Sequence, residues 1–347
     1  MPIPVLKMLT VGLLPSPLKI LWYRLRGAKI GKRVKIGLLS VIEAENIVIG
    51  DDTRIGLLSF LLLRKNLRLG ARVRIQSMVA ADTGSLSVGD DSTIMEQVII
   101  GGMLTPRSSI SIGKRVKIFP HAFLNPTEEI VIEDDVGIGG ASYIFTHGSW
   151  QNVLDGFQAS FAPVHIKKGA WLPWRVFVLP GVTIGEQAMI GPGALVTRSV
   201  PDRGAASGVP AEVRDLQGRH IRRLTPAFQE KLVRKILDDY VEYQQYVGQS
   251  CEKVGDDPDC VEIVHGKDKI VFSRAADTAK LEQAKFFISL LEIPQDKIRQ
   301  LENEGVIWFD LLGKRASLDR GHIAAELRNY FSRHGIRFEL LGPAVPR

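Results

Sequence analysis

Large aliphatic residues recur at every sixth position through the middle of the chain. One unbroken run comprises Ile166, Leu172, Val178, Ile184, Ile190 and Val196. The same period is found upstream as aliphatic–glycine pairs that begin at Ile30, Ile36, Ile49, Ile55, Leu69, Val88, Ile112 and Ile138. A helix repeats every 3.6 residues and a strand every two, so neither gives this spacing. A coil with three short faces does, because each face contributes one inward aliphatic residue and glycine is expected at the corners, where positive φ is needed.

The segments on either side of the repeat are expected to cap it, because each coil of a solenoid contacts only its neighbours. We expect a basic amphipathic N-terminal cap over residues 1–27, the repeat domain over 28–215, a packing helix over 216–250 and a small α+β domain of unknown role over 251–347. The predicted fold class is an all-β solenoid with a helical N-terminal cap and a C-terminal helix plus a small α+β domain.

The C-terminal third has no repeat. Thr225 followed by Pro226 is typical of a helix start, and the helix is expected to pack along the outside of the coil through Leu232, Ile236, Tyr240 and Tyr243. The sequence after Pro258 predicts a hairpin about Gly266, a helix from about Asp277, a strand from Val306, a helix from about Gly321 and a strand over 336–341.

Composition adds little to this picture but excludes some functions. The hydrophobic fraction of 45% supports a core, and the two cysteines, Cys251 and Cys260, have no metal-binding spacing. A reducing cytoplasm without a disulfide framework is the simplest interpretation. The net charge of +7 is modest and basic residues do not alternate with aromatic ones, so nucleic-acid binding is not expected.

The N-terminal segment is both apolar and basic. Its cations precede the first acidic residue, Glu43, and comprise Lys7, Lys19, Arg24, Arg26, Lys29, Lys32, Arg33 and Lys35. Prolines interrupt the apolar stretches, so none reaches the roughly 20 residues of a membrane-spanning helix, and no convincing signal-peptide cleavage site follows them. Two interpretations stay open: a helix that caps the first coil, and a segment that lies on an anionic membrane surface.

The repeat is interrupted once by a long insertion, between Ile144 and Ile166. A solenoid tolerates insertions as loops on one face, and such loops commonly carry function. This loop opens with Thr146 and His147. A hydroxyl group stays protonated near neutral pH, so a reaction in which it acts as the nucleophile needs a base, and an imidazole suits that task. We therefore predict that His147 is a general base.

The chain after the insertion carries three sequence motifs whose combination is highly specific. They are LPGVTIG at Leu179–Gly185, GALVTRSVP at Gly193–Pro201 and a Gly-x-Pro-Ala exit at Gly208–Ala211. This stretch resembles the end of the hexapeptide-repeat O-acetyltransferases, which include the galactoside, maltose and capsular-polysaccharide acetyltransferases. The resemblance covers about 190 residues of the chain and says nothing about the remainder.

The resemblance implies a left-handed parallel β-helix that forms a homotrimer, with acetyl-CoA in a groove between neighbouring subunits. It assigns the catalytic base to His147 and a substrate-binding role to Trp171. It also places an acceptor ligand one coil before the histidine, where His121 and Asn125 are the candidates.

Coenzyme A contacts are implied by the resemblance near Trp174, Pro192, Thr197 and Arg198. The cation that usually follows the Gly-x-Pro motif is Glu212 here, which is unfavourable beside a phosphate. Arg214 is the residue that could replace that cation.

A zinc site, as in the γ-type carbonic anhydrases that share this coil, needs a second histidine soon after the first. Asn152 stands there instead, so no metal is expected. The sequence thus predicts an acetyl-CoA-dependent O-acetyltransferase that acts on a carbohydrate hydroxyl, on a surface-polysaccharide or glycolipid precursor, in the cytoplasm or peripherally at the inner membrane face. Two alternatives stay open: an amino-sugar N-acetyltransferase and a non-catalytic β-helix scaffold.

Overall fold

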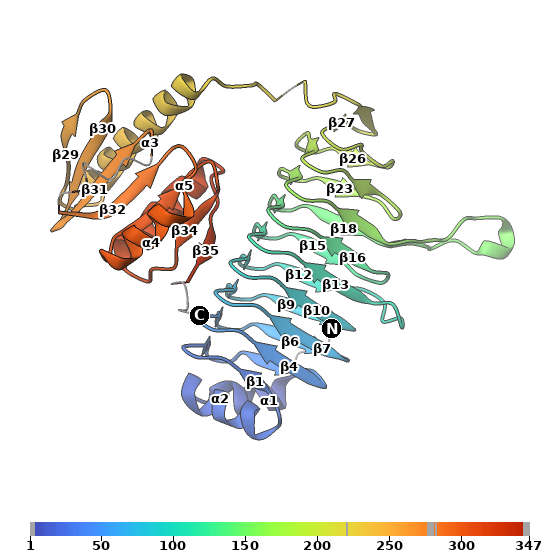
Figure 1. Cartoon of the computed structure of the whole chain (residues 1–347). Helices are drawn as coiled ribbons and strands as arrows, with labels where there is room; N and C mark the ends of the chain where they lie inside the picture. Colours follow the sequence, from blue (N-terminus) through green and yellow to red (C-terminus); the bar gives the residue numbers. More distant parts are fainter. Residues whose placement is uncertain (1–3, 220, 276–280, 282, 343–347) are drawn as a thin grey trace. The chain divides into compact units, whose positions relative to one another are not determined.

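The computed structural model describes residues 4–219, 221–275, 281 and 283–342, and the chain divides into two compact units, Met1–Ile221 and Arg222–Arg347 (Figure 1). The first unit is a stack of three-sided coils whose strands form three sheets, named A, B and C here in the order in which the chain enters them. The strands pair in parallel from coil to coil, and only the last pair of sheet B, β27 with β28, is antiparallel among the described strands of these sheets. The fold class predicted from the six-residue period is confirmed.

The strands of the three sheets are two to four residues long and follow one another in every coil. Sheet A contains β1 (Lys29–Ile30), β4 (Asn46–Ile49), β7 (Asn66–Leu69), β10 (Ser85–Val88), β13 (Ser109–Ile112), β16 (Ile130–Ile132), β21 (Val164–Ile166) and β24 (Thr183–Ile184). Sheet B contains β2 (Lys35–Ile36), β5 (Arg54–Ile55), β8 (Arg74–Ile75), β11 (Thr93–Ile94), β14 (Lys117–Ile118), β17 (Gly137–Ile138), β22 (Trp171–Leu172), β25 (Met189–Ile190), β27 (Ala205–Gly208) and β28 (Ala211–Arg214). Sheet C contains β3 (Val41–Glu43), β6 (Phe60–Leu63), β9 (Ala80–Thr83), β12 (Ile99–Gly101), β15 (Phe123–Asn125), β18 (Tyr143–Phe145), β23 (Phe177–Val178) and β26 (Leu195–Val196).

The core of the first unit is a set of aliphatic ladders. In each sheet the inward residue of one coil pairs with the inward residue of the next, as in Ile138 with Leu172 and Ile144 with Val178. All six residues of the predicted run are at most 3% exposed. Burial of each such side chain contributes about 1.5–3 kcal/mol, so the ladders supply the main stabilising term.

The corners between the sheets are held by polar contacts from coil to coil. At the corner between sheets A and B, Arg33 forms a bidentate ion pair with Asp52 of the next coil, and Arg72 does the same with Asp91. At the corner between sheets B and C, the buried hydroxyl of Ser59 donates to the carbonyl of Gln76 and accepts the amide of Val79. Because these contacts recur at a spacing of one coil, they fix the register of the very short strands.

The expected role of glycine at the corners is wrong in one respect. Positive φ at the corners is taken largely by non-glycine residues such as Asp52 and Leu58, whose φ values are 60° and 54°. Gly37 and Gly56 instead lie where the next coil approaches most closely: a Cβ on either would come 2.5 Å from backbone atoms of that coil. Glycine is therefore required there for space and not for its freedom in φ.

The N-terminal cap consists of α1 (Val5–Leu9), a 3-10 turn η1 (Val11–Leu13) and α2 (Ser16–Leu25). The Lys19 ammonium is fully buried and donates to the carbonyls of Gly12, Gly37 and Ser40, at 3.0, 2.6 and 3.4 Å. Burial lowers the pKa of Lys19 to about 8. The buried hydroxyl of Tyr23 accepts the amide of Ile42. The cap thus adds a hydrogen-bond donor to the carbonyls of Gly37 and Ser40 and an acceptor to the amide of Ile42, all in the first coil.

No single helix among the described residues has the length and hydropathy to cross a membrane. The pair Val5–Leu13 and Ser16–Leu25 meets the length and composition criteria only when both are taken together, and the two are bent by 111°.

The second unit is a seven-stranded mixed sheet whose strands follow one another in sequence order. They are β29 (Cys251–Asp256), β30 (Cys260–His265), β31 (Asp268–Ser273), β32 (Ala284–Ser289), β33 (Ile307–Asp310), β34 (Arg315–Ser317) and β35 (Glu339–Leu341), with helices α3 (Pro226–Tyr246), α4 (Gln295–Asn303) and α5 (His322–Arg333). Four predicted elements are confirmed: the hairpin about Gly266 is β30–β31, the strand from Val306 is β33, the helix from Gly321 is α5 and the strand over 336–341 is β35. The helix expected from Asp277 is wrong where the structure describes it, because residues 284–289 form β32; residues 276–280 lie outside the described residues.

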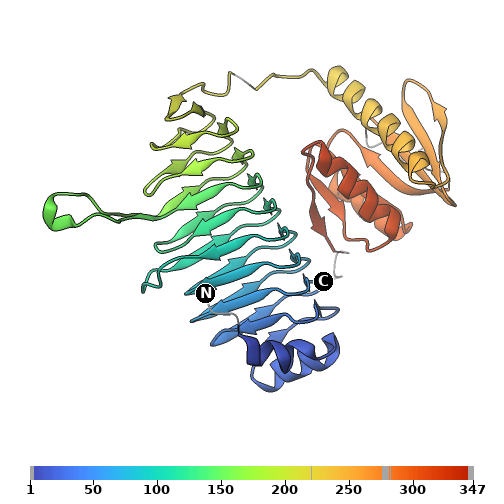
Figure 2. The same cartoon turned by 180° about the vertical axis from the view of Figure 1, so that it is seen from behind.

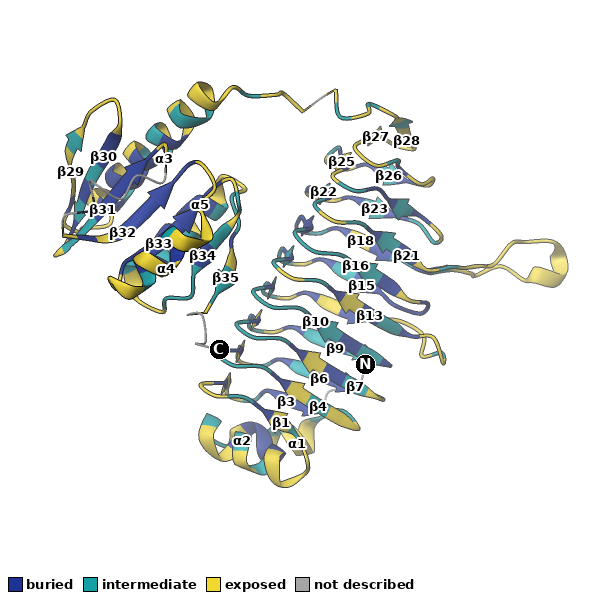
Figure 3. Ribbon diagram, viewed as in Figure 1, coloured by how far each residue is buried: buried dark blue, intermediate teal, exposed yellow. Residues whose placement is uncertain are grey.

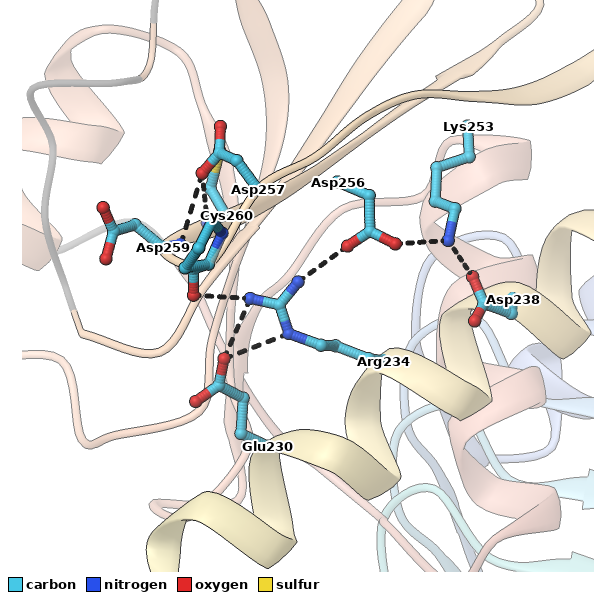
Figure 4. A network of polar contacts seen from close by, with 9 residues as sticks. Glu230, Arg234, Asp238, Lys253, Asp256, Asp257, Asp259 and Cys260 are labelled. Carbon is cyan, nitrogen blue, oxygen red and sulfur yellow. Dashed lines mark hydrogen bonds and ion pairs between the residues drawn. The ribbon is translucent and has the colours of Figure 1, made fainter.

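The predicted packing of α3 against the coil is also wrong. Its buried residues include Val233, Leu237 and Tyr240, which share a core with the seven-stranded sheet of the second unit. Polar contacts hold the exposed side of the helix to the β29–β30 hairpin (Figure 4). Arg234 donates to Asp256 at 2.8 Å and to the carbonyl of Pro258. The amphipathic pattern identified a packing helix but could not identify its partner.

The cap generates a stability prediction. Replacing Lys19 by Met should remove the three hydrogen bonds that its buried ammonium donates to the carbonyls of Gly12, Gly37 and Ser40, at a cost of about 1–3 kcal/mol. Hydrogen exchange followed by mass spectrometry should then show about 5- to 100-fold faster exchange over residues 10–42. The control is Lys29→Met, because Lys29 is exposed. Equal exchange in the two variants would contradict this role of Lys19.

Candidate functional site

The insertion predicted between Ile144 and Ile166 is a hairpin arm that projects from the stack of coils (Figure 2). Its base is a short antiparallel pair, β19 (His147–Gly148) with β20 (Ser160–Phe161), in which His147 lies opposite Phe161. The tip includes the 3-10 turn η2 (Val153–Asp155). His147 therefore lies at the root of the arm, where the chain leaves sheet C, at the corner between sheets C and A.

The imidazole of His147 is held by two side chains of the preceding coil. Its Nδ1 lies 3.1 Å from Oγ1 of Thr127 and 3.2 Å from Oδ1 of Asn125. The Thr127 hydroxyl in turn donates to Asn125 Oδ1, at 2.8 Å. An amide oxygen only accepts hydrogen bonds, and the Thr127 proton is already used, so Nδ1 must be the donor. The neutral imidazole then has its lone pair on Nε2.

The two supporting side chains are themselves fixed by burial and hydrogen bonds. Thr127 is fully buried and Asn125 is 5% exposed. The hydroxyl of Thr146 donates to the carbonyl of Asn125 at 2.7 Å, and the Thr127 hydroxyl accepts the amide of Met103. Gly102 is required beside them, because a Cβ there would overlap the Asn125 amide. The imidazole is thus oriented by a rigid part of the coil.

The opposite edge of the imidazole is open. The ring of Phe161 lies nearly parallel to that of His147, with centroids 5.9 Å apart. Nε2 has no hydrogen-bond partner within the part of the chain that the structure describes. A half-buried imidazole that is held in one tautomer, with an Nε2 that has no partner among the described residues, has the features of a general base.

A second group of predicted residues lies on sheet B and at the corner between sheets B and C. Trp171 covers Gly137 of the preceding coil, and the half-exposed Trp174 covers Gly140. Both indoles lie beside the ring of Phe119, with centroid separations of 6.1 and 6.4 Å. These contacts form a partly exposed aromatic platform, which we define as Phe119, Trp171 and Trp174.

The other predicted residues are distributed between the same two regions. His121 and Pro192 lie at the corner between sheets B and C, the former with a φ of 62°. Thr197 and Arg198 are exposed at the corner between sheets C and A, just after β26. Arg214, at the end of sheet B, lies 3.4 Å from Glu212 in an exposed ion pair, so its guanidinium is partly engaged.

The predicted site residues therefore form two separate groups in one chain. In a three-sided coil, the corner between two faces lies opposite the third face, so His147 lies across the coil from Trp171 on sheet B. The structure brings Asn125 to His147, but it brings neither to the aromatic platform. Thr127 is the residue that sequence reasoning missed. Its signal was its position twenty residues before His147, which is one coil length.

Two further observations concern metals and the remaining histidine of this unit. Within the described ranges, no group of three or more His, Cys, Asp or Glu residues is arranged to hold a metal ion. His165 faces outward from sheet A, and its Nε2 lies 2.7 Å from a carboxylate oxygen of Glu133.

Comparisons with known proteins find relatives among the acetyltransferases. No family model matches the chain. A Staphylococcus aureus (strain COL) protein assigned as an acetyltransferase is 40% identical over 72 residues, which is 20% of this chain and 36% of that protein. The galactoside O-acetyltransferase of Lactococcus lactis is 47% identical over 51 residues, which is 15% of this chain and 25% of that enzyme. The matched segment thus spans about a third or less of each of these two relatives.

Among solved structures, the hexapeptide-repeat acetyltransferase of Vibrio cholerae in complex with acetyl-CoA overlaps 40% of this chain and 70% of that chain, with 21% identity and a TM-score of 0.32. The sequence relatives bear on the assignment more directly, because their identity over the shared segment is higher. They confirm the resemblance inferred from the sequence: this chain resembles the hexapeptide-repeat acetyltransferases.

Proposed function

We propose that the protein is an O-acetyltransferase that moves an acetyl group from acetyl-CoA to a carbohydrate hydroxyl. The observation that carries the proposal is the held tautomer of His147, with Nδ1 bound to Asn125 and Thr127 and Nε2 open. The similarity of the repeat to acetyltransferases supports the same chemistry. The proposed acceptor is a surface-polysaccharide or glycolipid precursor.

The proposed reaction needs one proton to be held and then returned. Nε2 of His147 takes the proton of the acceptor hydroxyl as that oxygen forms a bond to the acetyl carbon. When the carbon–sulfur bond breaks, Nε2 returns the proton to the leaving thiolate, which becomes the free thiol of coenzyme A, and the imidazole ends neutral. Asn125 accepts from Nδ1–H throughout and stabilises the charged intermediate form of the ring. No covalent acyl-enzyme is required.

The division of the predicted residues between two regions supports a site shared by two copies of the chain. The corner that carries His147, Thr197 and Arg198 in one copy would face the platform of Trp171 and Trp174 in the next. A ring of three copies closes such a head-to-tail contact, which is the proposed homotrimer. The arm also favours a neighbour, because Trp150 and Leu154 at its tip are 95% and 90% exposed in the single chain.

The residues proposed to bind acetyl-CoA differ in how well they suit that role. Trp174 and Pro192 offer exposed apolar surface, and Thr197 offers a hydroxyl and backbone groups. Arg198 is exposed and suited to a phosphate. Arg214 is the weaker candidate because of its ion pair with Glu212. We keep Arg198 as the proposed phosphate ligand, and His121 as an acceptor ligand on the neighbouring copy. We no longer assign Asn125 to the binding of the acceptor substrate; its proposed role is to orient His147.

The proposed location follows from the chemistry. The donor is a coenzyme A thioester, and two cysteines without a disulfide framework suit a reducing compartment. We therefore propose the cytoplasm, with a peripheral position at the inner membrane face if the acceptor is a glycolipid.

The base assignment predicts the behaviour of a His147→Ala variant. With acetyl-CoA and a panel of galactosides as acceptors, kcat should fall by about 10²- to 10⁴-fold, because general-base catalysis is lost. Calorimetric titration with acetyl-CoA should show unchanged binding. The control is His322→Ala, whose side chain is exposed in the second unit. Retained turnover in His147→Ala would refute the assignment, and absent acetyl-CoA binding in the unaltered protein would favour a scaffold.

The positioning role of Asn125 predicts a change in pH dependence. Asn125→Asp keeps an acceptor for Nδ1–H but adds a negative charge, which favours the protonated imidazole. Since the base must be neutral, the acid limb of the kcat/KM profile should move to higher pH, with KM for acetyl-CoA unchanged. Asn125→Leu removes the acceptor and should lower kcat by about 10- to 100-fold. An unshifted acid limb in Asn125→Asp would contradict direct contact with the base.

A further inference from the structure

The two helices of the N-terminal cap carry many exposed residues (Figure 3). Helix α1 buries none of its residues, and the buried residues of α2 are Lys19 and Tyr23. The exposed large apolar residues of the cap, which we call the cap surface, are Val5, Leu6, Leu9, Leu13, Leu18, Leu21 and Leu25, each at least 50% exposed. Isolated exposed apolar side chains are ordinary, but seven in one short segment are not.

The outward direction of these leucines is imposed by the fold. Ser16, Lys19 and Tyr23 follow one another at spacings of three and four, so they share one face of α2. All three bind backbone groups of the first coils. Leu18, Leu21 and Leu25 have the same spacing on another face, so they must point away from the coil while α2 keeps these contacts. The apolar surface is therefore a stable feature of the folded cap.

Unpaired cations lie in the first coil, next to the cap in the chain. No acidic residue precedes Glu43, whereas eight basic residues do. Lys7 is paired with Glu43 and Arg33 with Asp52. The exposed ammonium groups of Lys29, Lys32 and Lys35 in the first coil form no ion pair or hydrogen bond within the described residues. Arg54 and Arg74 extend this charge along sheet B, directly in register with Lys35.

We propose that the cap surface binds an anionic lipid bilayer, with its leucines in the interfacial region and Lys29, Lys32 and Lys35 against the headgroups. Apolar side chains flanked by lysines have the chemistry of interfacial membrane segments. A second copy of the chain is a poorer occupant, because two caps face to face would bring like charges together. A soluble polyanion would satisfy the lysines but leave the leucines in water.

The proposal does not depend on the acetyltransferase activity, because it involves neither His147 nor the aromatic platform. It adds a partner to the cap, which otherwise only closes the end of the coil. In the proposed trimer, three caps would lie at one end of the threefold axis and bind the bilayer together. Such multivalency strengthens binding without any new kind of contact.

The test is flotation of the full chain with vesicles of phosphatidylcholine alone and with added phosphatidylglycerol. We expect binding to the anionic vesicles, weakened by salt. The triple variant Lys29→Ala, Lys32→Ala, Lys35→Ala should bind about 100-fold more weakly, at about 1 kcal/mol per cation. Leu6→Ser with Leu21→Ser and Leu25→Ser should abolish flotation.

The matched controls are Lys231→Ala, Lys267→Ala, Lys314→Ala for charge and Val254→Ser, Leu312→Ser for apolar surface, all exposed in the second unit. Both controls should float like the unaltered chain, and circular dichroism should show that all variants are folded. Equal losses in the cap and control variants would overturn the proposal. So would leucine variants that float normally while dextran sulfate displaces the protein, since that result indicates a polyanion site.

Discussion

The parallel hydrogen bonds between successive coils are the constraint on which the rest of the first unit depends. They place each residue about 4.8 Å from its equivalent one coil away. Strands of two to four residues could slip, but the inward ladders and the corner contacts, such as Arg72 with Asp91 and Ser59 with Gln76, prevent it. This register carries Thr127 and Asn125 to the imidazole of His147. The orientation of the candidate base is thus a property of the whole stack.

The need for backbone hydrogen bonds also shapes the N-terminal end of the stack of coils. A solenoid ends in coils whose polar backbone groups lack neighbours, and the cap satisfies those of the first coils with Lys19, Ser16 and Tyr23. Because these polar side chains occupy the inner face of α2, the leucines occupy the outer face. A requirement of backbone hydrogen bonding thus produces an apolar surface next to unpaired lysines. Closure of the coil and binding of a membrane can be two results of one arrangement.

The six-residue period was enough to predict the coils, their inward residues and the interruption that carries His147. It could not predict the contact of Thr127 with His147. The two residues are twenty positions apart, and they meet only because the coil at that corner is twenty residues long. The partner of α3 was mispredicted, since an amphipathic stripe shows that a helix packs but not against what. The segment after Asp277 was assigned as a helix, yet Ala284–Ser289 pairs between two parallel strands, where tertiary pairing outweighs local preference.

The central claim is that a complete acetyltransferase site combines His147 of one copy with the aromatic platform of another. Co-expression of a His147→Ala chain and a Trp171→Ala chain with different affinity tags would allow mixed trimers to be isolated. Each mixed trimer should contain one unaltered site of three, so about a third of the original activity should return although both parent variants are inactive. Mixed trimers as inactive as their parents would contradict a site shared between copies.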